Sequence, residues 1–123
     1  MGQPMEIPPQ LQEQIARLQQ LQQTLQVIVS QKQQLDVELA DTTRAIEELE
    51  KVPDDAVIFK SLGAILVKKD KGSVAKELSE KKELLNVRVS VLGKQEEKTR
   101  EKLKELEAQL QAKLRPAAAR PPS

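Results

Sequence analysis

Residues 56–70 read AVIFKSLGAILVKKD, and this connector is the most informative part of the sequence. It is rich in apolar and β-branched residues and has Gly63 near its centre. Because two short apolar runs around a turn residue are typical of a β-hairpin, the stretch predicts two strands of about five or six residues joined near Leu62 and Gly63. We place its apolar residues on two faces, one with Val57, Phe59, Ile65 and Val67 and the other with Ile58, Leu62 and Leu66.

An isolated two-stranded hairpin is marginally stable in water, and its outer edges present unpaired backbone groups. The rest of the sequence predicts no further strand that could cover it. We therefore expect the hairpin to be an assembly element that is completed by other subunits. The residues expected to make these contacts are Val57, Phe59, Leu62, Gly63, Ile65, Leu66 and Val67, together with Val87 and Val91 on the following helix.

The sequence on both sides of the hairpin predicts a long helix. From Ile7 to Leu49 apolar positions repeat with the 3,4 spacing of a coiled coil, and ten of the thirteen seam positions are Ile or Leu, so the first helix is predicted over residues 8–51. The same spacing returns over residues 74–114, where Ser73 is a candidate N-cap, and we expect residues 116–123 to be disordered. Two such helices predict a mainly α fold, a single domain spanning residues 1–123. In this antiparallel coiled coil, facing residue numbers sum to about 127 or 128.

A second apolar stripe lies off the seam near the start of the second helix. It consists of Val74, Leu84, Val87 and Val91. A helix that is apolar on two faces has two neighbours, here its partner helix and either the β-hairpin or an adjacent subunit. The alternative is that these are scattered surface residues, which are common.

Composition excludes several classes of function. The chain has no His and no Cys, so it lacks an imidazole base, a thiolate nucleophile and soft metal ligands, and we expect no enzyme activity, metal or cofactor. A net charge of +1 and a single aromatic residue disfavour nucleic-acid binding. No apolar run is long enough to span a membrane and no signal peptide is evident, so the expected location is the cytoplasm.

One motif resembles a known family. The run Val57-x-Phe59-Lys60-x-x-Gly63-x-Ile65-Leu66-Val67-Lys68, after a long Gln-rich helix and before Glu77-Leu78, is similar to the beta subunits of archaeal prefoldin. The resemblance covers about residues 7–114. The family usually has Tyr at the position of Phe59, which keeps the ring and loses a hydroxyl. The alpha-type subunit has a longer connector with two hairpins, so the short connector favours the beta type.

The resemblance implies a heterohexamer of two alpha and four beta subunits, whose hairpins form a β-barrel body from which coiled coils extend. It also implies an ATP-independent chaperone that holds non-native polypeptides and passes them to a group II chaperonin. The competing hypothesis is a purely structural coiled-coil adaptor or oligomerisation module.

In this family the coil ends far from the hairpin contact the client polypeptide. The residues of this chain expected there are Met5, Ile7, Leu11, Ile15, Leu18, Leu106, Leu110 and Leu114. The alternative is that most of them only close the coil. Ile15 and Leu114 lie one position off the seam, which makes them the best candidates for client contact.

Overall fold

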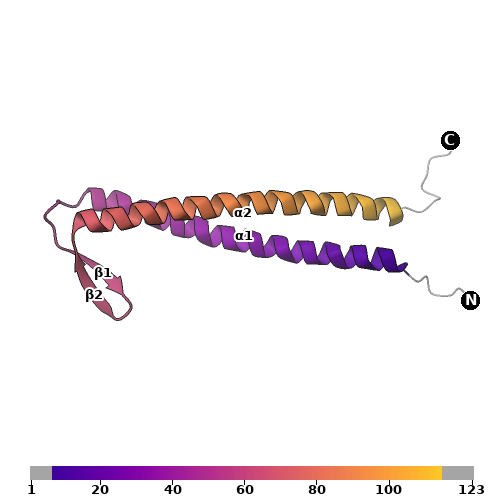
Figure 1. Cartoon of the computed structure of the whole chain (residues 1–123), viewed down its shortest axis with the longest axis horizontal. Coiled ribbons are helices and arrows are strands. Elements are labelled where there is room, and N and C mark those ends of the chain that lie inside the picture. The colour runs from indigo at the N-terminus through magenta and orange to yellow at the C-terminus, as the bar shows by residue number, and fades with distance from the viewer. Residues whose placement is uncertain (1–6, 115–123) are drawn as a thin grey trace, which may run out of the picture. The chain divides into compact units, whose positions relative to one another are not determined.

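The computed structural model describes residues 7–114, in which two long helices are joined by a two-stranded antiparallel sheet (Figure 1). Helix α1 spans Pro9–Glu50, strand β1 Ile58–Leu62, strand β2 Ile65–Lys69 and helix α2 Lys71–Leu114. The mainly α fold with a β-hairpin connector is thus confirmed. The predicted tail at 116–123 and the candidate client residue Met5 lie outside the described residues.

Prolines set both ends of α1. Pro9 occupies the first helical position, where its missing N–H is not needed, and α1 ends at Glu50, shortly before Pro53. Helix α2 begins at Lys71 rather than at residue 74, because Asp70 and not Ser73 is the cap. The Asp70 Oδ1 accepts a hydrogen bond of 2.6 Å from the backbone N–H of Ser73.

The described chain falls into two compact units, and each takes one segment from each helix. Unit 1 contains residues up to 30 and from 94 onward. Within it, the Lys113 Nζ donates a hydrogen bond of 2.9 Å to the Gln14 Oε1, and these residue numbers fit the predicted antiparallel register. Its core is a narrow stripe of buried side chains from both helices, namely Ile28, Leu103, Leu106 and Leu110.

Unit 2 contains residues 31–93 and includes the sheet. Leu49 from α1 and Leu85 from α2 are its buried apolar side chains. Thr42 is also buried, and its hydroxyl donates to the Glu38 carbonyl at 2.8 Å, so the polar group is satisfied within its own helix. The Lys81 Nζ lies 3.3 Å from a Glu38 carboxylate oxygen and links the two helices of this unit.

The hairpin turns through a two-residue loop, Gly63 and Ala64, because Leu62 pairs with Ile65. Gly63 has a φ of 59°, whereas no other described residue has a positive φ. A glycine with positive φ at the first loop position is the pattern of a type II′ turn, whose twist matches that of the flanking strands. Gly63 therefore lies where the turn requires glycine.

This register corrects the predicted assignment of faces. Residues directly opposite each other in a sheet share a face, and each pair here joins an odd and an even residue number. Ile65 and Val67 therefore lie on the same face as Ile58 and Leu62, whereas Leu66 shares its face with Phe59. The prediction was wrong because it continued the odd–even alternation through the loop, which reverses it.

Candidate interaction surfaces

One face of the hairpin, which we call the inner face, is tied to the start of α2. Lys60 of β1 and Lys69 of β2 both lie on this face, and both contact the Glu77 carboxylate. The Lys60 Nζ is 2.8 Å from one Glu77 oxygen, and the Lys69 Nζ is 3.5 Å from the other. The hydrogen bond from Lys60, with the positive charges of both lysines, holds the pKa of Glu77 below its ordinary value.

A second lysine contact fixes the base of the hairpin. The Lys71 Nζ, at the start of α2, donates to the Val52 carbonyl at 2.7 Å and to the Asp54 carboxylate at 3.1 Å. Val52 lies in the connector, two residues after the end of α1. One side chain thus joins the segment leaving α1 to the helix that follows the hairpin.

The opposite face of the hairpin, which we call the outer face, exposes apolar side chains beside Ser61 and Lys68. Phe59 is 59% exposed and Leu66 is 68% exposed, and Val57 beside them is also exposed. Leu62 and Ile65 belong to the inner face and are also exposed, at the tip next to Gly63, whereas Val67 on the same face is half-buried. Neighbouring exposed apolar side chains are typical of a surface used for protein–protein contact.

The second apolar stripe on α2 also lies in unit 2. Leu84, Val87 and Val91 are exposed and recur at helical spacing, so they share one face of α2. Val87 and Val91 border a groove of about 450 Å³ between the two helix segments of this unit, which Leu35 and Leu92 also line. An open apolar groove and an open hairpin face therefore occur in the same compact unit.

The predicted client residues occupy unit 1 and differ in exposure. Ile7 is 46% exposed and Leu114 59% exposed, so these two are accessible in the single chain. Leu11, Ile15 and Leu18 are half-buried. Leu106 and Leu110 are buried, and they could touch another polypeptide only if this end of the coil opened.

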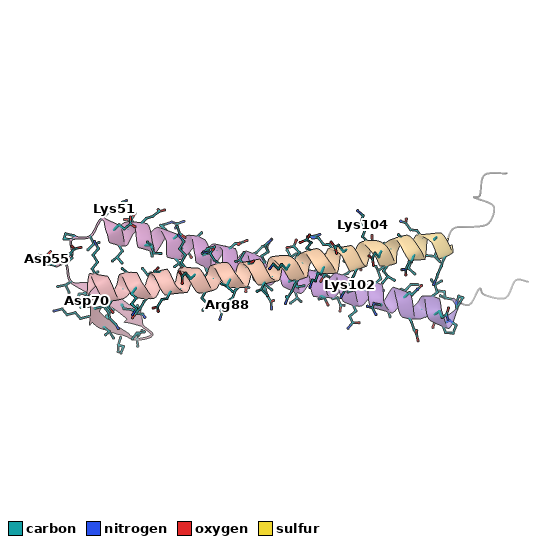
Figure 2. All side chains as sticks on the ribbon, turned by 45° about the horizontal axis from the view of Figure 1, so that its top comes forward. Lys51, Asp55, Asp70, Arg88, Lys102 and Lys104 are labelled. Atoms are coloured by element: carbon teal, nitrogen blue, oxygen red, sulfur yellow. The ribbon has the colours of Figure 1, made fainter. Side chains whose placement is uncertain are left out.

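The remaining surface carries charges of both signs. Figure 2 shows charged side chains around the connector, among them Lys51, Asp55 and Asp70, and others on α2, among them Lys102 and Lys104. Among residues 7–114, no helix is long and apolar enough to cross a membrane. The same residues include no cluster of acidic side chains that could hold a metal ion.

Sequence reasoning missed the polar contacts that position the hairpin. The sequence marks Glu77 only as part of a motif, and no pattern in it distinguishes Lys69 or Lys71. Several of these contacts join residues that are 17 or 19 positions apart in the sequence. Helical or strand periodicity does not predict contacts at such separations. The one available signal was the joint occurrence of Lys60 and Glu77 in the family motif.

These observations define a class of protein: a helical hairpin whose β-hairpin connector exposes an apolar face that a single chain leaves uncovered. A family model described as "Prefoldin subunit" matches residues 12–117. The chain belongs to the prefoldin subunit family.

Named relatives agree with this assignment. The chain is 48% identical over 113 residues to a protein named prefoldin subunit beta from Thermococcus kodakarensis, covering 92% of this chain and 97% of that protein. It is 49% identical, with the same coverage, to the prefoldin subunit beta of Archaeoglobus fulgidus. The crystal structure of the prefoldin beta subunit from Thermococcus strain KS-1 matches with a TM-score of 0.81 and 47% identity, covering 92% of this chain and 99% of that one.

Proposed function

We propose that the chain is the beta-type subunit of a hetero-oligomeric chaperone that holds non-native polypeptides without ATP. The observation that carries this proposal is the open outer face of the hairpin in a chain of this family. Phe59 and Leu66 leave large apolar side chains exposed to water in the single chain. Side chains of this kind are well suited to a buried interface between subunits. The partner that this face fits is an alpha-type prefoldin subunit, together with further beta-type copies.

The assembly that we propose contains two alpha-type and four beta-type subunits, with the hairpins joined in a β-barrel body. Forming a barrel satisfies the free strand edges of each hairpin, because a closed sheet has no edges. In unit 2, Val87 and Val91 extend the proposed interface from the hairpin onto α2, next to the groove that they border. Of the proposed hairpin residues, Val57, Phe59 and Leu66 lie on the outer face, Leu62 and Ile65 are exposed at the tip beside Gly63, and Val67 is half-buried on the inner face.

Client polypeptides would bind at the ends of the two helices in unit 1. Unfolded chains differ from folded ones mainly in their exposed apolar surface, and Ile7 and Leu114 offer accessible apolar side chains there. Leu11, Ile15 and Leu18 follow along α1 and are half-buried, and Leu106 and Leu110 become available where the coil end frays. Met5 belongs to the same proposed set.

The energetics favour weak contacts that act together. Fully burying one Leu or Ile gains at most ~1.5–3 kcal/mol, so a single coil end binds a client weakly. Several coil ends on one body raise the overall affinity through effective concentration. Because the individual contacts remain weak, they release one at a time, and no nucleotide is needed. A group II chaperonin in the cytoplasm is the proposed recipient of the client.

The experiment that tests this function measures light scattering when a chemically denatured protein is diluted in the absence of nucleotide. With this chain and an alpha-type subunit present, we expect aggregation to be suppressed. A structural adaptor would form the same complex and leave aggregation unchanged, so this result would refute the proposal and favour the adaptor. The proposal includes no catalysis, nucleic-acid binding or membrane association.

A further inference from the structure

A single carboxylate fastens both strands of the hairpin to α2. One oxygen of Glu77 lies 2.8 Å from the Lys60 Nζ, and the other lies 3.5 Å from the Lys69 Nζ. Lys60 belongs to β1 and Lys69 to β2, so the two contacts reach different strands. A hairpin held at two points on different strands has less rotational freedom about its attachment than one held at a single point.

The direction of these contacts decides which face stays open. In the sheet, Lys60 is opposite Val67 and Lys69 is opposite Ile58, so both lysines lie on the inner face. Both of these apolar neighbours are only half-buried, so apolar packing does not fully cover the inner face. The ion pairs with Glu77 therefore help to hold the inner face, and not the outer face, against α2.

The other charges near Glu77 come from the same three elements. Lys60 and Lys69 approach from β1 and β2. Glu80 and Lys81 of α2 line a second groove, which Lys60 and Glu77 also border. The Lys81 Nζ is 3.3 Å from a Glu38 oxygen, so this cation pairs with α1. Among residues 7–114, the cations that pair with Glu77 are therefore the two lysines of the hairpin strands.

We propose that Glu77 is a positioning residue for subunit assembly: it holds the inner face of the hairpin on α2 and so presents the outer face to the partner. This inference rests on the proposed function, because it takes the outer face as the assembly surface. Partly exposed ion pairs add little to the stability of a fold and are screened by salt. Their effect here is on the fraction of chains whose hairpin is oriented for assembly, and that fraction scales the apparent affinity.

The test compares Glu77→Gln with Glu83→Gln, which removes the same charge from an exposed α2 position that has no ion pair among residues 7–114. Hydrogen exchange of the hairpin amides is measured in the free chain, and assembly is measured by titration with an alpha-type subunit. For Glu77→Gln we expect hairpin exchange and the apparent dissociation constant both to rise about threefold to tenfold at low salt. Glu83→Gln should match the wild type in both measurements.

Two further arms make the test specific to the ion pairs. High salt should bring hairpin exchange in the wild type close to that of Glu77→Gln, because salt screens the pairs that the variant lacks. Reversing all three charges, with Glu77→Lys, Lys60→Glu and Lys69→Glu in one chain, should restore both exchange and assembly. Exchange at the buried helix residues Leu85 and Leu103 should stay constant throughout.

Unchanged hairpin exchange in Glu77→Gln would overturn the inference, as would faster exchange with unchanged assembly or an equal effect of Glu83→Gln. A wild-type chain that does not combine with the alpha-type subunit would refute the proposed function and the assembly role together. Normal wild-type assembly with an unaffected Glu77→Gln variant would refute only the role of Glu77. The two failures are therefore distinguishable.

Discussion

Replacing Phe59 by Ser separates the stability of the single chain from the stability of the assembly. The ring lies on the outer face of the hairpin and is 59% exposed, so the isolated chain gains little from it. In the proposed assembly the same ring is covered by a neighbouring hairpin. We therefore expect Phe59→Ser to leave the helices of the free chain intact and to weaken assembly.

The size of the effect follows from the exposed fraction. Full burial of a Phe side chain is worth ~1.5–3 kcal/mol, and about three-fifths of this ring is still exposed, so assembly gains ~1–2 kcal/mol from covering it. A factor of ten in affinity corresponds to ~1.4 kcal/mol, so the dissociation constant per subunit should rise about 5-fold to 30-fold.

The assay is sedimentation velocity over a concentration series with the alpha-type subunit, with circular dichroism of the free chain to measure helix content. Val27→Ser is the matched control, because Val27 is also an apolar side chain, 54% exposed, but lies on α1 in unit 1. The control should assemble like the wild type. An unchanged dissociation constant for Phe59→Ser, or an equal loss in both variants, would refute the reasoning about the outer face.

Three further predictions concern the turn, the coil ends and pH. Gly63→Ala places a side chain at a φ of 59° and should destabilise the hairpin by ~1–2 kcal/mol, measured by hydrogen exchange. Gly93→Ala, within α2 with open space around the new Cβ, should instead stabilise the chain by ~0.5–1 kcal/mol, and equal effects would contradict the turn argument. Replacing Ile15 and Leu114 together by Ser should weaken suppression of client aggregation and leave assembly intact, and loss of assembly would reject this division of roles. The folded chain lowers the pKa of Glu77 from its ordinary value of 4.5. The stabilisation of the hairpin by ionised Glu77 is therefore complete above the ordinary pKa of 4.5 and is lost as the pH falls through the lowered pKa. The difference in hairpin protection between wild type and Glu77→Gln should disappear in acid. A difference that persisted in acid would show that charge is not the cause.

The helical part of this fold is predictable because its determinants are local and periodic. Apolar residues at 3,4 spacing define the seam, and nearly equal helix lengths on either side of one connector predict the antiparallel register that Gln14 and Lys113 display. The turn is predictable for a related reason, since Gly63 between two β-branched runs leaves few alternatives.

The strand faces and the start of α2 depend on features that periodicity does not contain. The face of each strand residue follows from the length of the loop, and a loop of two residues reverses the odd–even pattern between β1 and β2. The start of α2 depends on the competition between Asp70 and Ser73 for the role of cap, and both residue types suit it. The three-dimensional structure was needed to decide each point.

The interaction surfaces are predictable in composition and less so in geometry. The apolar character of Phe59 and Leu66 is visible in the sequence, but their shared exposure on one face required the strand register. The Glu77 contacts with Lys60 and Lys69 required the placement of the hairpin against α2, which depends on tertiary structure alone. Sequence therefore indicated which residues are unusual, and structure indicated which of them act together.

We propose that this chain is an incomplete structural unit, which a partner of the same family completes. Native mass spectrometry of the chain, alone and mixed with an alpha-type prefoldin subunit, provides the decisive test. We predict one discrete hetero-oligomer containing two alpha-type and four beta-type chains. Spectra in which the two chains remain separate species at every mixing ratio would contradict the account.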